Sequence, residues 1–154
     1  MSQINDKTKT NSRKEWLGIL ARASTDELEK LLSPLISTLK MRWVRPPEIG
    51  MIMLRARIGG IGDLFNMGEA TITRCAVQLE PGALGIGYTL GREKRKAELI
   101  AIADALLQDT LVQNKLLQTI ISTIKSNQTE RIHQEQSEMA KSKVEFFTMV
   151  RGDS

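Results

Sequence analysis

The middle of the chain alternates small or apolar residues with polar ones, and this period of two predicts β-strands. Glu69 to Leu79 follows the alternation and is rich in β-branched residues. Leu84 to Leu90 places Leu, Ile and Tyr on one face, and Gly and Thr on the other. Between them lies Glu80-Pro81-Gly82-Ala83, where proline presets φ and glycine accepts a positive φ. The pattern predicts a half-buried antiparallel hairpin.

Two stretches before the hairpin also predict strands. Arg42 to Arg45 is expected to form a short strand that Pro46-Pro47 ends, because proline cannot donate to a strand ladder. Ile49 to Ile58 is expected to form the next strand, with apolar residues at its even positions and two arginines among its odd ones. With the hairpin, these stretches predict a four-stranded antiparallel meander with short connections.

Helical signals precede the strands. Ser12-Arg13-Lys14-Glu15 is a capping box, which predicts the start of a first helix. Ser24-Thr25-Asp26-Glu27 repeats the signal and predicts a second helix. Pro34 is expected to end or kink this second helix, because it removes a backbone donor.

The helical period returns after Arg92 and dominates the C-terminal half. A broad apolar stripe predicts a long amphipathic helix, and Leu111 to Ile124 predicts another. Ser126 to Thr129 is expected to break the helix, and Glu130 to Lys143 is polar almost all round. The predicted fold is therefore α+β, with the meander flanked by N-terminal helices and a long C-terminal helical region.

The length of 154 residues predicts one domain. Residues 1–11 are polar and are expected to form a disordered lead-in, followed by a single domain over residues 12–154. Within the tail, residues 144–154, an apolar group is expected to bind a partner subunit, or a second copy of the chain when the partner is missing. Packing on the chain's own sheet is the alternative. The apolar group of the tail comprises Phe146, Phe147, Met149 and Val150.

Glycine is unusual on one face of the second hairpin strand. Gly85 and Gly87 share that face, and glycine inside a strand often marks close approach of another backbone, a ligand or a partner. Two interpretations stay open for these positions. One is a subunit interface, and the other is a bulge or a tight contact between a helix and the sheet.

The composition limits which ligands and reactive groups the chain can be expected to have. The net charge of +4 suits an anionic ligand or partner, but it is too small and dispersed to indicate nucleic acid, and aromatic residues are only 4%. Cys75 is the single cysteine and is expected to be a buried hydrophobe, while His133 is expected at the surface. No carboxylate pair or metal-ligand spacing stands out. No apolar run has the length of a signal peptide or a membrane span, so a cytoplasmic location is expected.

Arginine is the best candidate for polar function, because its planar fork suits phosphate or phosphonate oxygens. Surface or interface ion pairs are the favoured alternative for these side chains. Gly59-Gly60-Ile61-Gly62 resembles a phosphate-binding loop, but the helix that should follow such a loop is not predicted here. The candidate anion-binding residues are Arg55, Arg57, Arg74, Arg92 and Lys94.

An ordered set of short motifs resembles the PhnG family, the small subunit of the bacterial carbon–phosphorus lyase core complex. The motifs are FxxGxAT-x-TR-x-A-V from Phe65, LG-x-G-Y-x-LGR-x-K from Leu84, Ala56-Arg57-Ile58-Gly59-Gly60-x-Gly62, and the terminal FFTMVRGD from Phe146. The similarity is collinear from about Trp16 to Asp153.

The resemblance implies an accessory subunit that assembles with PhnH-, PhnI- and PhnJ-like subunits and with a PhnL-like ATPase. The complex would transfer alkylphosphonate to the ribose C1 of MgATP, releasing adenine and forming ribose 1-methylphosphonate 5-triphosphate. The resemblance places catalysis on the PhnI- and PhnJ-like subunits, so this chain is expected to have no catalytic residues, metal or cofactor of its own. An independent anion-binding module and a weak nucleic-acid binder are the alternatives.

Overall fold

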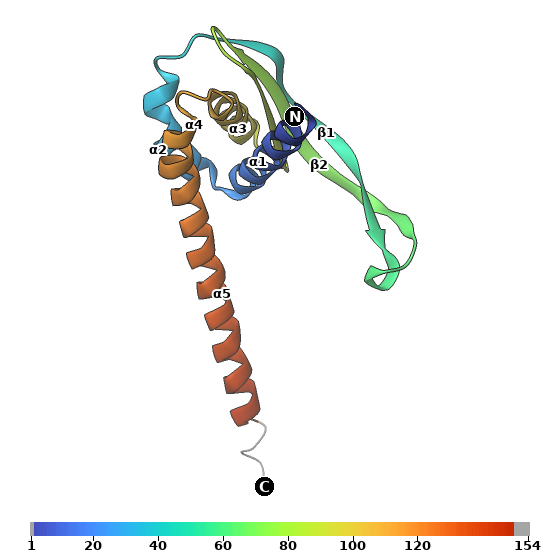
Figure 1. Ribbon diagram of the computed structural model, residues 1–154. Coiled ribbons are helices and arrows are strands. Elements are labelled where there is room, and N and C mark those ends of the chain that lie inside the picture. Colours follow the sequence, from blue (N-terminus) through green and yellow to red (C-terminus); the bar gives the residue numbers. More distant parts are fainter. Residues whose placement is uncertain (1, 150–154) are drawn as a thin grey trace.

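The computed structural model describes the backbone of residues 2–149 and the side chains of residues 12–141, and it is a mixed α and β structure (Figure 1). A 3₁₀ turn, Ile58–Gly60, joins the first two strands, and a π-helical turn, Leu117–Ile121, joins the last two helices. In chain order the elements are α1 (Ser2–Arg22), α2 (Thr25–Ile36), β1 (Met41–Arg57), β2 (Leu64–Leu79), β3 (Leu84–Leu90), α3 (Lys94–Leu107), α4 (Gln113–Leu116) and α5 (Ser122–Met149).

The sheet is antiparallel and has three strands in the order β1-β2-β3. The α+β class is therefore confirmed, but the prediction of four strands is wrong. Arg42 to Arg45 and Ile49 to Ile58 fall largely within β1, which is one strand interrupted by shifts of register on either side of Arg45. Pro46 and Pro47 lie at the second shift, on an edge strand, where a missing backbone donor does not end the ladder.

Helix α3 lies between the sheet and the other helices and is buried on nearly all sides. Toward the sheet it forms an apolar core with Cys75, Val77 and Leu79 of β2. Away from the sheet it forms a second core with α1, α2 and the helical segment that leads into α5. The broad apolar stripe of α3 suits such an interior position. The second core comprises Trp16, Ile19, Leu20, Ala23, Leu28, Leu32, Leu99, Ile100, Ala103, Leu107, Leu116, Ile120, Ile121 and Ile124.

The helix boundaries differ from prediction in two places. Helix α1 begins at Ser2, so Ser12 lies inside it rather than at its start, while disorder of residues 1–11 in solution stays a prediction. Helix α5 runs without a break through Ser126 to Thr129. The polar residues there bind neighbours instead of turning the chain, because Asn127 donates to Glu27 of α2 and Gln128 donates to the carbonyl of Ile19 in α1.

The other helix signals are confirmed where the structure tests them. The Ser24 hydroxyl accepts a hydrogen bond from the Glu27 backbone amide at 3.2 Å, which caps α2. Pro34 lies inside α2, and the helix ends soon after it, at Ile36. None of the helices in the described part of the chain is both long and apolar enough to cross a membrane.

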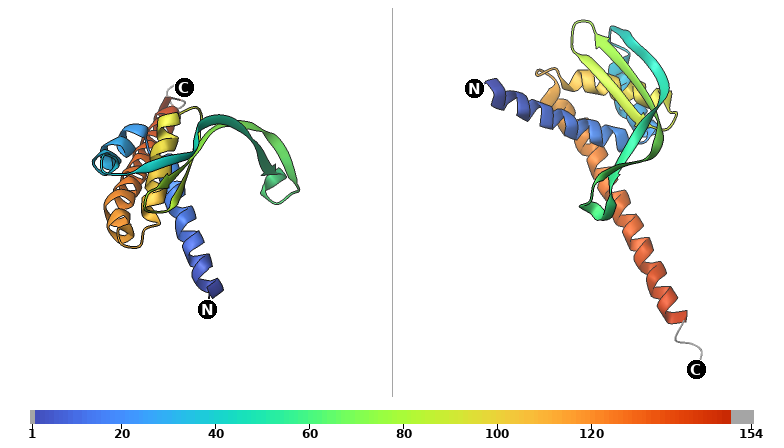
Figure 2. Two further views of the ribbon diagram at one scale, coloured as in Figure 1. Left: turned by 90° about the horizontal axis from the view of Figure 1, so that it is seen from above. Right: turned by 90° about the vertical axis from the view of Figure 1, so that its right-hand side faces the viewer.

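Strands β1 and β2 extend beyond β3 as a two-stranded ribbon. Strand β3 pairs with β2 only from Ile72 to Gln78, whereas β2 pairs with β1 from its first residue, Leu64. We call residues 51–71 the β arm. The arm curves away from the helices and stands clear of the rest of the molecule (Figure 2).

Candidate functional site

The five predicted anion-binding residues lie on separate elements. Arg74, on β2, donates to Glu48 of β1 at 2.7 Å, and Arg45 approaches the same carboxylate oxygen at 3.5 Å. Arg74 therefore forms the surface ion pair that was the favoured alternative. Arg92 and Lys94 are both exposed near the start of α3.

Arg55 and Arg57 lie together at the far end of the β arm. They are opposite Asn66 and Leu64 in the ribbon, and the alternation of the strand places both on one face. Arg57 donates to the carbonyl of Gly62 at 3.1 Å in the turn of the arm. The structure thus pairs two of the five predicted cations on one surface and places the others elsewhere.

The glycine face of β3 is covered by α3. A Cβ atom on Gly85 would lie 2.0 Å from the carbonyl oxygen of Ala101, and one on Gly87 would lie 2.0 Å from that of Ala97. No side chain fits at those distances, so the two glycines permit the backbone of α3 to approach the sheet. The tight contact between helix and sheet is therefore what the structure shows. The alternative hypothesis, that Gly85 and Gly87 form a subunit interface, is wrong for this face, because α3 leaves no room for a partner there.

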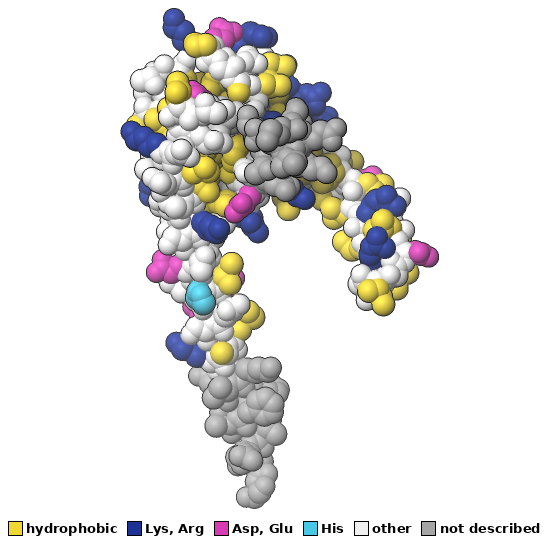
Figure 3. Space-filling view, viewed as in Figure 1, with side chains coloured by type: hydrophobic (Ala, Val, Ile, Leu, Met, Phe, Trp, Pro, Cys, Tyr) yellow, Lys and Arg dark blue, Asp and Glu magenta, His cyan; other side chains and the backbone are white. Residues whose placement is uncertain are grey.

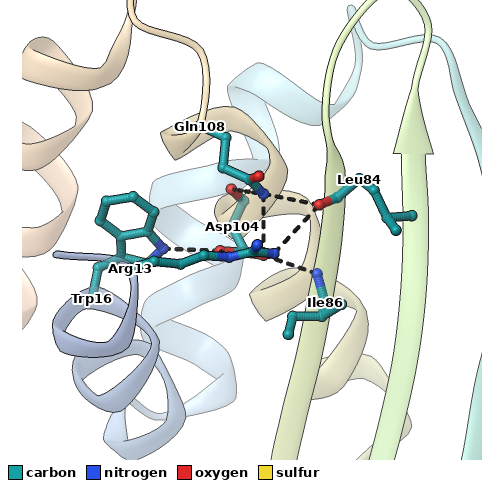
Figure 4. Close-up of polar contacts among 6 residues, drawn as sticks. All are labelled: Arg13, Trp16, Leu84, Ile86, Asp104 and Gln108. Carbon is teal, nitrogen blue, oxygen red and sulfur yellow. Dashed lines mark hydrogen bonds and ion pairs between the residues drawn. The ribbon is translucent and has the colours of Figure 1, made fainter. Parts of the chain in front are cut away.

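Asp104 is the centre of the most extensive buried polar network of the described residues (Figure 4). Its side chain is fully buried on α3. It accepts hydrogen bonds from Arg13 Nη2 at 2.6 Å and Nε at 3.1 Å, and from Trp16 Nε1 at 2.9 Å. It also accepts from the backbone amide of Ile86 at 2.9 Å. One carboxylate thus joins α1, α3 and β3. It accepts several hydrogen bonds, which a buried charge requires.

The same network closes part of the outer edge of β3. The carbonyl of Leu84 accepts from Gln108 Nε2 at 2.8 Å and from Arg13 Nη2 at 3.4 Å. Together with the Ile86 amide, these bonds occupy backbone groups that an edge strand would otherwise offer to another strand. This end of the sheet is therefore protected by side chains.

Asp104 is not among the residues predicted to be functional, although the sequence around it contains a usable signal. Asp104 is a charged residue within an apolar helical stripe, between Ala103 and Ala105. Burial at that position requires cationic or N–H donors from elsewhere. Nothing in the local pattern identifies Arg13, because that residue lies 91 positions earlier in the chain.

The predicted roles of the two isolated reactive side chains fit the structure. Cys75 is buried beneath α3, and burial, together with the negative charge of Glu98, raises the pKa of its thiol to about 12. The thiolate is the reactive form, so Cys75 is inert near neutral pH. His133 is exposed on α5. Among the described residues, no group of three His, Cys, Asp or Glu side chains is placed to hold a metal ion.

The β arm carries the most concentrated exposed apolar surface of the described chain (Figure 3). On one face, Ile52 is opposite Ala70, and Ala56 is opposite Phe65. On the other face, methionines lie nearer the body and the two arginines lie nearer the end. The exposed large apolar residues of the arm are Met51, Ile52, Met53, Ile58, Ile61, Leu64, Phe65 and Met67. An exposed apolar surface of this extent is typical of an interaction site.

A small α+β domain with a structural polar network and an exposed apolar arm has the features of an interaction subunit. The chain matches the family model of phosphonate metabolism protein PhnG over residues 11–152. It is also 36% identical over 152 residues to alpha-D-ribose 1-methylphosphonate 5-triphosphate synthase subunit PhnG of Rhizobium meliloti (strain 1021). That alignment covers 99% of this chain and 97% of the relative. The chain therefore belongs to the PhnG family of phosphonate metabolism proteins, and the predicted resemblance is confirmed.

Proposed function

We propose that this protein is an accessory subunit of a ribose 1-methylphosphonate 5-triphosphate synthase. The observation that carries the proposal is the similarity to a named subunit of that synthase along nearly the whole of both chains. A match of this extent includes the residues of the arm as well as those of the core. The partners proposed are PhnH-, PhnI- and PhnJ-like subunits and a PhnL-like ATPase, in the cytoplasm.

The proposed role is structural rather than catalytic. The complex joins an alkylphosphonate to the ribose C1 of MgATP and releases adenine, so MgATP is a substrate of the assembly. The polar groups that this chain buries serve its own fold: Asp104 is bonded on several sides, and Cys75 is protonated at neutral pH. The exposed arm provides a surface by which such a subunit organises partners that carry the chemistry.

Reconstitution tests this function. The PhnH-, PhnI- and PhnJ-like subunits are co-expressed with and without this chain, and the mass of each complex is measured by light scattering. Adenine release and formation of the phosphonate ester are then followed with the PhnL-like protein, MgATP and methylphosphonate. We expect this chain to co-purify with the subunits, and its omission to abolish both assembly and adenine release. Full turnover without this chain would contradict the proposal.

A further inference from the structure

The β arm lacks a core of its own. A two-stranded ribbon is only marginally stable in water unless a third strand or a packed surface supports it. Strand β3 ends its pairing with β2 at Ile72, and no described element covers the ribbon beyond that point. Both faces of the ribbon are exposed, because Met51 on one face is 69% exposed and Phe65 on the opposite face is 42% exposed. The described residues of this chain therefore do not provide the cover that would stabilise the arm, and another molecule is the source that we consider.

Both faces of the arm require cover. One face is apolar along its length, with Ile52 and Phe65 exposed and Leu54 partly buried between its neighbours. The opposite face exposes Met51 and Met53, whose flexible thioether side chains adapt to irregular surfaces. A flat surface can bury only one face of a ribbon. The molecule that covers this arm therefore provides a groove or a cleft.

The end of the arm carries two exposed arginines, Arg55 and Arg57, and one exposed carboxylate, Asp63. Among the described residues, the ion pairs of the chain include neither Arg55 nor Arg57. Both guanidinium groups lie on the methionine face, next to the exposed Leu64. Arginine beside apolar residues is typical of protein interfaces, where it pairs with carboxylates. The complementary groove is therefore apolar along its length and acidic where it receives the end of the arm.

We infer that the β arm inserts into an apolar groove of a different subunit, and that carboxylates in this groove bind Arg55 and Arg57. The inference rests on the proposed function and identifies one surface by which the chain joins its complex. A second copy of this chain is the poorer occupant. Contact between two arms would cover only one face of each ribbon and leave the other face exposed.

The groove between α1 and α5 of a second copy also fits poorly. A groove of about 740 Å³ lies between α1 and α5 of this chain. Four basic residues, Lys14, Arg22, Lys125 and Arg131, contribute to its lining, against two carboxylates. Such a groove would repel the arginines at the end of the arm.

Substitutions on each face of the arm test the inference. Ile52→Lys and Met53→Lys place a charge on opposite faces, outside both apolar cores. Each variant is titrated with the separately purified PhnH-, PhnI- and PhnJ-like subunits. We expect each to weaken binding by about tenfold or more, because the charge must be desolvated in the groove. Leu111→Lys, at a residue 91% exposed in the loop after α3, is the matched control and should bind as the wild type does. Thermal unfolding of each variant shows that the body of the protein remains folded.

A charge reversal tests the acidic end of the groove. Arg55→Glu combined with Arg57→Glu should reduce affinity by about tenfold or more, chiefly at low salt, because repulsion replaces attraction. Lys30→Glu combined with Lys40→Glu changes the net charge equally at exposed positions on the body, and should leave affinity near that of the wild type.

The outcomes separate the two claims. If the wild-type chain does not bind the partner subunits at all, the proposed function fails. If the wild-type chain binds and the arm variants bind equally well, the inference is overturned while the proposed function stands. A wild-type homodimer that Ile52→Lys and Met53→Lys both dissociate would also overturn it, by identifying a second copy as the occupant.

Discussion

Asp104 holds three elements together at the scale of a single residue. Its carboxylate accepts from Arg13 and Trp16 of α1 and from the Ile86 amide of β3 while it stands on α3. In the described part of the chain, no buried side-chain polar atom lacks a hydrogen-bond partner. Removal of one carboxylate would leave several buried donors unpaired at once.

Asp104→Ala is therefore expected to lower the free energy of unfolding by about 3–5 kcal/mol, the usual cost of breaking a buried charged pair. Urea denaturation followed by circular dichroism measures the change. Asp26→Ala removes an exposed carboxylate from the first turn of α2 and should cost less than about 1 kcal/mol. A stability for Asp104→Ala equal to that of the wild type would show that the network contributes little.

Gly87 is the second residue whose substitution gives a clear test, because it lies where α3 comes close to the sheet. A Cβ atom there meets the Ala97 carbonyl oxygen at 2.0 Å, so Gly87→Ala must push α3 away from the sheet. Overpacking of this kind costs about 1–3 kcal/mol, and Gly87→Val should cost more and reduce soluble yield. Gly50→Ala is the matched control, because a Cβ atom on that strand residue meets nothing within 4 Å. Thermal unfolding distinguishes the two, and equal melting temperatures would contradict the close approach.

At the scale of elements, sequence periodicity predicts those helices and strands that depend on residues close together in the chain. The hairpin of β2 and β3, the amphipathic α3 and the Ser24 cap follow from residues close in sequence. The continuity of β1 through Pro46-Pro47 does not, because it depends on the strand lying at a sheet edge. The helical path through Ser126 to Thr129 likewise depends on distant partners, such as Glu27 and Ile19. The same limit explains why the Asp104 network could not be assembled from sequence.

A deletion at the end of α5 tests the predicted contact of the tail. Phe146, Phe147 and Met149 lie where side chains are not described, and Val150 lies outside the described backbone, so the predicted tail contact stays a prediction. The described apolar core reaches Ile124 and does not extend along the rest of α5.

Deletion of residues 145–154 should therefore leave the melting temperature within a few degrees of the wild type, because it removes no residue of the described core. Co-purification with the PhnI- and PhnJ-like subunits should be lost, since the apolar tail is predicted to bind a partner. An unfolded truncated chain would place the tail in the chain's own core. A truncated chain that folds and assembles fully would exclude both roles.

At the scale of the whole molecule, the candidate anion-binding residues lie on different parts of the surface. Arg55 and Arg57 are at the end of the β arm, and Arg74 is paired with Glu48 on the sheet. Arg92 is exposed in the loop before α3. A triphosphate or phosphonate site requires several cations converging on one anion. The described chain distributes its candidates instead, as a subunit that contacts partners over a wide area would.

The isolated chain is accordingly expected to show no saturable binding of MgATP or methylphosphonate below about 1 mM. That affinity requires about −4.1 kcal/mol of binding free energy. An exposed ion pair contributes only about 0.2–1 kcal/mol, so the two arginines of the arm cannot supply it alone. Isothermal titration calorimetry measures the binding, and Arg92→Ala in the assembled complex should leave nucleotide affinity unchanged. Micromolar binding by the isolated chain, lost when Arg55 and Arg57 are both changed to Ala, would instead establish an independent anion-binding module. An affinity that survives those changes and falls with Arg92→Ala would locate such a site at the start of α3.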